Sequence, residues 1–80
     1  MYSITVKLSG IDEAKEFVKR ASECNFDVDL CYNKVVIDAK SILGVMSLDL
    51  RKILTVKMNG RDETFENWLE ELHKAALEAA

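Results

Sequence analysis

The sequence predicts an α+β fold, a βαββαβα open-faced sandwich in which three helices cover one face of a four-stranded antiparallel sheet. Four short segments alternate apolar and polar residues and are rich in β-branched residues, which is typical of half-buried strands. Other segments repeat apolar residues every three or four positions, as amphipathic helices do. A repeated β-α-β unit with a hairpin between its halves gives this sheet, with one face left to solvent.

The first strand is expected at residues 2–8, where apolar and polar side chains alternate. Ser9 followed by Gly10, Ile11 and Asp12 fits a loose capping box that opens a helix. The apolar stripe of this helix consists of Ala14, Phe17, Val18, Ala21 and Cys24.

A hairpin is expected next. Residues 27–32 alternate as a second strand, and Asn33-Lys34 makes a tight turn that lacks the usual glycine. In the third strand Val35, Ile37 and Ala39 are expected to share one face.

Ser41 is predicted to cap a short helix that ends near Leu50. The fourth strand contains Leu54, Val56 and Met58, and Asn59-Gly60 is a turn signal. Asp62 can cap a last helix, whose core-facing stripe consists of Phe65, Trp68, Leu69, Leu72, Ala75 and Ala76.

Length and composition limit the function classes. Eighty residues suit one domain, which we place at 1–80, and the net charge of −3 with scattered lysines argues against nucleic acid. No apolar run is long enough to span a membrane, and the chain enters a strand pattern at once, so we expect a cytoplasmic protein without a signal peptide. Cys24 and Cys31 lack the spacing of a zinc site and are expected to be buried thiols, so no metal or cofactor is predicted.

The Ser41 helix has apolar residues on too many sides to bury them all. Ile42, Leu43 and Met46 are expected to face water or a partner, beside a serine whose phosphate would meet the positive end of the helix dipole. Lys40 could add positive charge nearby. An ordinary capped helix in a small core remains the alternative, because a serine at an N-cap needs no kinase to explain it.

Residues 40–48, Lys-Ser-Ile-Leu-Gly-Val-Met-Ser-Leu, closely resemble HPr, the histidine-containing phosphocarrier of the bacterial sugar phosphotransferase system. The predicted element order agrees with that family along the whole chain. Further matching residues are Ser9-Gly10-Ile11, Ala21-Ser22, Asp27-Val28-Asp29-Leu30, Tyr32-Asn33, Asn59-Gly60 and Asp62-Glu63.

The chain departs from HPr where that family accepts phosphate. In HPr, Gly-Ile or Gly-Leu precedes the phosphoryl-accepting histidine and then Ala-Arg-Pro-Ala, whereas Asp12-Glu13-Ala14-Lys15 follows here. Counting back from Ser41 suggests a two-residue deletion, so either Asp12 or Gly10 occupies the place of the histidine. The only histidine, His73, is expected to face solvent on the last helix.

The resemblance implies an HPr-like protein of the phosphotransferase system that is not an enzyme and has no catalytic residue. We expect a regulatory interaction module that docks through Ile42, Leu43 and Met46. In many Gram-positive members the serine that matches Ser41 is phosphorylated by an ATP-dependent kinase, and the phosphoserine form binds a transcriptional regulator. The expected partners are therefore phosphotransferase-system proteins, a serine kinase or a transcriptional regulator, and neither nucleic acid nor membrane.

Three alternatives stay open at this point. The chain could carry phosphate on a non-histidine acceptor, since the Asp12 carboxylate can form an acyl phosphate. Asp12 and Glu13 could imitate the charge of a phosphohistidine, although acids in a first helical turn are also explained by the helix dipole. The domain could also have kept the fold and bind something unrelated.

Overall fold

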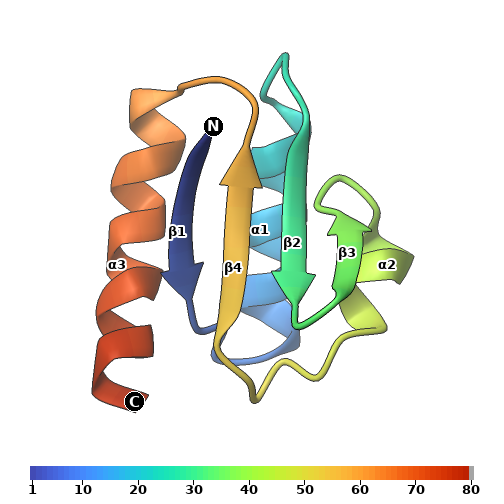
Figure 1. Ribbon diagram of the computed structural model, residues 1–80, viewed down its shortest axis with the longest axis vertical. Coiled ribbons are helices and arrows are strands. Elements are labelled where there is room, and N and C mark those ends of the chain that lie inside the picture. The colour runs from blue at the N-terminus through green and yellow to red at the C-terminus, as the bar shows by residue number, and fades with distance from the viewer. Residues whose placement is uncertain (80) are drawn as a thin grey trace.

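The computed structural model describes residues 1–79 and has the predicted order of elements. These are β1 (Tyr2–Val6), α1 (Ile11–Ser22), β2 (Val28–Tyr32), β3 (Val35–Asp38), α2 (Ile42–Met46), β4 (Leu54–Met58) and α3 (Glu63–Ala79). The strands form one sheet in the order β1-β4-β2-β3, and every neighbouring pair is antiparallel. The predicted α+β open-faced sandwich is therefore confirmed (Figure 1).

One face of the sheet and the apolar stripes of the helices form the core. Leu30, Leu54, Val56 and Met58 point from the strands into it, and all four are fully buried. From α1, Phe17 packs against Phe65 and Trp68 of α3, with ring centroids 6.0 and 6.4 Å apart. These contacts place α1 and α3 on the same face of the sheet.

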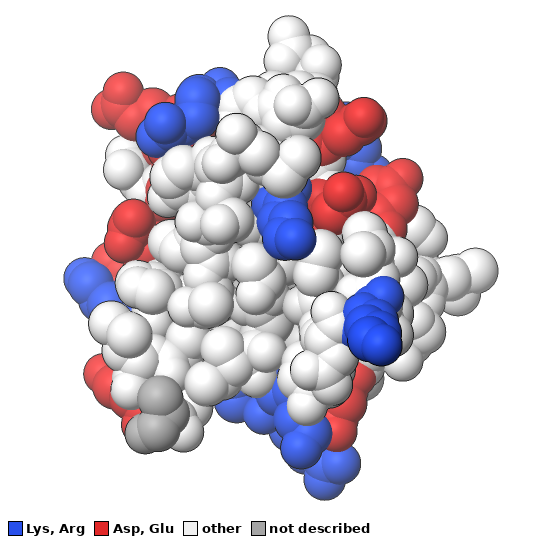
Figure 2. All heavy atoms as spheres, in the orientation of Figure 1, with Lys and Arg blue, Asp and Glu red and all other residues white. Residues whose placement is uncertain are grey.

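The opposite sheet face carries the alternate residues of each strand, and no helix of residues 1–79 lies over it (Figure 1). Figure 2, in the same orientation, shows mostly uncharged atoms on this face, with a basic group near its middle, acidic groups beside it and further charges around the rim. In the described residues, 1–79, no helix is long and apolar enough to cross a membrane.

The turn between β2 and β3 works without glycine because Asn33 takes its place. Asn33 has a φ of 54°, in the left-handed region that asparagine tolerates better than most residues. At the other end of the sheet, the Asp62 carboxylate accepts the Phe65 N–H at 2.8 Å, so the predicted cap of α3 is confirmed.

Several expected boundaries and orientations are wrong. β1 ends at Val6 instead of residue 8, because β4 pairs with it only as far as Leu54. α1 begins after Gly10, and no side chain caps it. Only half of the expected capping box forms, in which Glu13 accepts the Ser9 N–H at 2.8 Å.

The interior face predicted for β3 is only partly realised. Ala39 is buried and Ile37 is half-buried, but Val35 is 47% exposed. β3 is the outermost strand, and α2 covers it near Ile37, where the Ile37 side chain fills the space beside Gly44. Val35, beside the turn, lies outside that cover.

Candidate functional site

The candidate site is built on Ser41, which ends the loop after β3 and caps α2. Its backbone is extended, with φ −100° and ψ 111°, and its Oγ accepts the Gly44 N–H at 3.1 Å. Its carbonyl accepts the Val45 N–H at 3.0 Å, which starts the helix. The expected N-cap is therefore present, and the Ser41 side chain is exposed.

α2 is much shorter than predicted and ends at Met46 instead of near Leu50. The Ser47 N–H bonds to the carbonyls of Leu43 and Gly44, and its hydroxyl donates to the Gly44 carbonyl. The Asp49 side chain then accepts the Arg51 N–H at 3.0 Å and forms a turn. Serine and aspartate side chains compete in this way with the hydrogen bonds of a helix, and here their bonds end α2 at Met46.

The three predicted docking residues fall into two groups. Leu43 is 83% exposed and Ile42 39%, so both present apolar surface to solvent. Met46 is half-buried and packs against the core, as the fully buried Val45 does. Met46 therefore presents less of its side chain to water than expected, because it packs against the core next to the fully buried Val45.

Lys40 does not direct its charge toward Ser41. Its Nζ donates to the Cys24 carbonyl at 2.9 Å, where it ties the loop before α2 to the end of α1. Its N–H bonds to the Asp38 carboxylate at 3.0 Å. The residue expected to supply positive charge beside a phosphoserine is thus engaged elsewhere.

Ile11, the first residue of α1, adds to the exposed apolar surface and was not singled out from the sequence. It is 59% exposed. Arg20 follows Ile11 by nine residues, or about two and a half helical turns, and stacks on Trp68 of α3. By helical periodicity Ile11 therefore lies on the face of α1 opposite to Arg20, and α1 also packs against α2. Ile11 could have been identified from the sequence, because it is a large apolar residue that lies outside the apolar stripe of its helix.

The start of α1 presents carboxylates and no imidazole. Asp12 is exposed in the first turn of the helix, while Glu13 is held by the Ser9 N–H. Gly10 is the N-cap.

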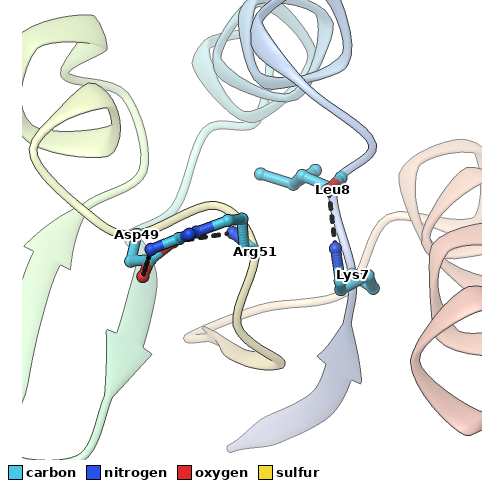
Figure 3. A network of polar contacts seen from close by, with 4 residues as sticks. All are labelled: Lys7, Leu8, Asp49 and Arg51. Carbon is cyan, nitrogen blue, oxygen red and sulfur yellow. Dashed lines mark hydrogen bonds and ion pairs between the residues drawn. The ribbon is translucent and has the colours of Figure 1, made fainter. Parts of the chain in front are cut away.

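Figure 3 shows the charged groups of two neighbouring loops at this end of the sheet. Arg51 grips Asp49 with two side-chain hydrogen bonds of 3.0 and 3.1 Å, and Lys7 reaches the Leu8 carbonyl at 3.5 Å. The hydrogen bonds from the Arg51 side chain and N–H lower the pKa of Asp49 to about 2. Each of these contacts stays within its own loop, so the Arg51 guanidinium is committed to Asp49.

His73 is not solvent-facing, contrary to expectation. It is half-buried on α3, and its Nδ1 donates to the Thr5 carbonyl at 2.8 Å and lies 3.2 Å from the Thr5 hydroxyl. A carbonyl can only accept, so Nδ1 carries the proton. The histidine therefore joins α3 to the outer edge of β1.

The cysteines are free and buried, as predicted. Burial raises the pKa of both thiols, Cys24 and Cys31, which disfavours the reactive thiolate. Within residues 1–79 no group of three or more histidine, cysteine or acidic side chains is arranged to hold a metal ion.

Comparisons with known proteins agree on one family. A family model described as the PTS HPr component phosphorylation site matches residues 11–77. The crystal structure of HPr-C-His from Thermoanaerobacter tengcongensis is similar with a TM-score of 0.74 and 23% identity, covering 98% of this chain and 97% of that one. A mycoplasma histidine-containing phosphocarrier protein is similar with a TM-score of 0.63 and 16% identity, over 98% and 90% of the two chains. At these identities the structural likeness bears on the fold alone.

Proposed function

Because the chain belongs to the HPr family of the phosphotransferase system, we propose that it serves there as a non-catalytic regulatory module. In this role it is recognised by protein partners and does not pass phosphate along the relay. The observation that carries the proposal is the location of its only histidine, His73, on α3 in a bond to Thr5.

The chemistry at the start of α1 supports this reading. Reversible phosphoryl transfer by HPr depends on an imidazole, with an arginine to balance the phosphate charge. Here the first turn offers Asp12 and Glu13, whose negative charges repel an incoming phosphoryl group. The Arg51 guanidinium is paired with Asp49 and not with these two carboxylates.

The docking surface that we assign consists of Ile42 and Leu43 of α2 together with Ile11 of α1. It combines exposed apolar side chains from two packed helices, the kind of patch that marks a protein interaction site. Ser41 lies at its border with an exposed hydroxyl, so a phosphate there would place up to two negative charges beside the patch. We assign the module to the cytoplasm, where the phosphotransferase relay operates.

Two measurements test the proposal. The chain is incubated with phosphoenolpyruvate and the upstream enzyme of the relay, and separately with ATP and the HPr serine kinase, and its intact mass is followed. We expect no phosphate from the relay and one phosphate on Ser41 from the kinase. Transfer from the relay that is lost in Asp12→Asn would instead establish a carrier with a carboxylate acceptor.

Binding tests the docking surface. Leu43→Asp is expected to abolish binding to the upstream enzyme or to the transcriptional regulator, measured by calorimetry. Leu77→Asp is the matched control, since Leu77 is also exposed, at 62%, but lies on α3. Equal effects of the two substitutions would contradict the assignment of the surface to α2.

A further inference from the structure

The two edge strands of the sheet, β1 and β3, differ in whether other segments bond to their outward main-chain groups. At the β1 edge, α3 supplies partners for the main chain, because His73 donates to the Thr5 carbonyl and the Leu72 carbonyl accepts the Lys7 N–H at 3.1 Å. Proteins commonly cover edge strands in this way, since an open edge is a template for another strand. At the opposite edge α2 covers β3 near Ile37, and within residues 1–79 no such main-chain partner reaches Val36.

The two exposed apolar residues of β3 are both valines. Val36 is 61% exposed and Val35 47%, although valine is a strand former that natural edges tend to avoid in favour of charge or proline. The helix α2 packs on the core side of β3, at Ile37, and leaves these valines uncovered.

The register shows which main-chain groups point outward. The hairpin closes with Tyr32 opposite Val35 across a two-residue turn, so Val35 and Ile37 direct their N–H and C=O groups toward β2. The Ala39 N–H continues this pattern by bonding to the Val28 carbonyl at 2.9 Å. The N–H and C=O of Val36 therefore point away from the sheet, and no loop or side chain of residues 1–79 bonds to them.

We propose that β3 pairs with β3 of a second copy of this chain, antiparallel, about a twofold axis at Val36. The two Val36 residues then exchange a pair of main-chain hydrogen bonds, and two four-stranded sheets become one of eight strands. This inference concerns the strand edge and does not depend on the proposed regulatory function.

The charges beside Val36 favour this pairing. In an antiparallel register centred on Val36, Lys34 of each copy, in the turn just before β3, comes beside Asp38 at the far end of the other copy's strand. Both residues are exposed, and neither belongs to an ion pair within the described part of the chain. Opposite charges that face each other across antiparallel strands stabilise their pairing. The charges along the β3 edge are thus complementary to those of a second β3 edge that runs antiparallel to it.

The dimer would also affect the docking surface. A twofold axis normal to the sheet keeps both α2 helices on the same side and brings them together across the new junction, since α2 flanks β3 (Figure 1). The exposed Leu43 of each copy would then lie on a helix beside the junction. The interface is small, so the dimer is expected to dissociate in the range of roughly 10 µM to 1 mM.

Sedimentation velocity on the full chain tests the proposal. Protein concentrations from about 10 µM to 1 mM cover the dissociation constants expected for this small interface. We expect the average mass to rise from one chain toward two. Lys34→Asp places two like-charge pairs at the junction and should raise the dissociation constant about tenfold or more. Lys74→Asp, an equal charge change on α3 at the other edge, should leave it unchanged.

A charge exchange separates a specific junction from a general effect of charge. Lys34→Asp and Asp38→Lys should each be monomeric alone, and their mixture should form a heterodimer because both facing pairs become attractive. Val36→Lys gives an independent variant that puts two lysines at the axis. A wild type that stays monomeric at about 1 mM, or equal loss in the Lys34 and Lys74 variants, would overturn the proposal. So would a mixture that fails to associate although both variants unfold cooperatively.

Discussion

The N-cap of α2 lets structural and regulatory roles of Ser41 be separated by measurement. Ser41→Ala removes the hydroxyl that accepts the Gly44 N–H at 3.1 Å and leaves that donor without a protein partner. Loss of a serine cap costs about 1 kcal/mol, within a range of roughly 0.5–2 kcal/mol. α2 has only five residues, so it has few other helical hydrogen bonds to hold it.

For a domain of this size, about 1 kcal/mol corresponds to a decrease in Tm of roughly 4–8 °C. We expect that decrease for Ser41→Ala in thermal unfolding followed by circular dichroism. Ser41→Asp should keep the wild-type Tm, because an aspartate oxygen accepts the same N–H. Ser9→Ala is the matched control, since the Ser9 hydroxyl is exposed and has no hydrogen bond within residues 1–79.

Equal unfolding temperatures of Ser41→Ala and Ser9→Ala would contradict the role of Ser41 as a cap. So would a loss of stability in Ser41→Asp as large as that in Ser41→Ala. If the cap is confirmed, Ser41→Asp becomes a tool. Any change in partner binding that it causes then reflects negative charge at the patch and not unfolding of α2.

Three further expectations follow from other contacts. Arg51→Ala should return the pKa of Asp49 from about 2 toward 3.8 in a carboxyl titration by NMR. Because the folded-state pKa is lowered, the stabilisation by this pair is present above pH 3.8 and disappears as the pH falls through about 2, so the two proteins should converge in stability there. His73→Ala should lower the free energy of unfolding in urea by about 1 kcal/mol, since the Thr5 carbonyl loses its donor; an unchanged midpoint would show that water replaces it. Cys31, 6% exposed and with its pKa raised by burial, should react slowly with a thiol reagent until denaturant is added, and rapid labelling of the folded chain would contradict its placement.

The sequence was sufficient where a single period governs a long segment. The alternation of Leu54, Val56 and Met58 and the stripe through Phe65 and Leu69 predict buried faces, and the structure buries all five residues. Such patterns work because each side chain's direction follows from its own position in the element.

It was insufficient where contacts between distant segments decide the outcome. His73 looked solvent-facing among alanines and acids, but its partner Thr5 is 68 residues away in the sequence. Val35 has the right parity for the core, yet β3 is an edge strand, and strand order is not encoded in alternation. The early end of α2 depends on hydrogen bonds of Ser47, which a propensity argument does not count.

The candidate site differs from these cases because Ser41 has two uses that do not conflict. As a cap, its oxygen accepts the Gly44 N–H, and a phosphate on that oxygen would add further acceptors at the same place. α2 could therefore stay folded while the charge beside Leu43 changes. The Lys40 ammonium donates a hydrogen bond to the Cys24 carbonyl, and it would have to break this bond to neutralise the charge of a phosphate on Ser41. A modification at Ser41 is thus expected to act on partner choice through electrostatics, with the fold of the module unchanged.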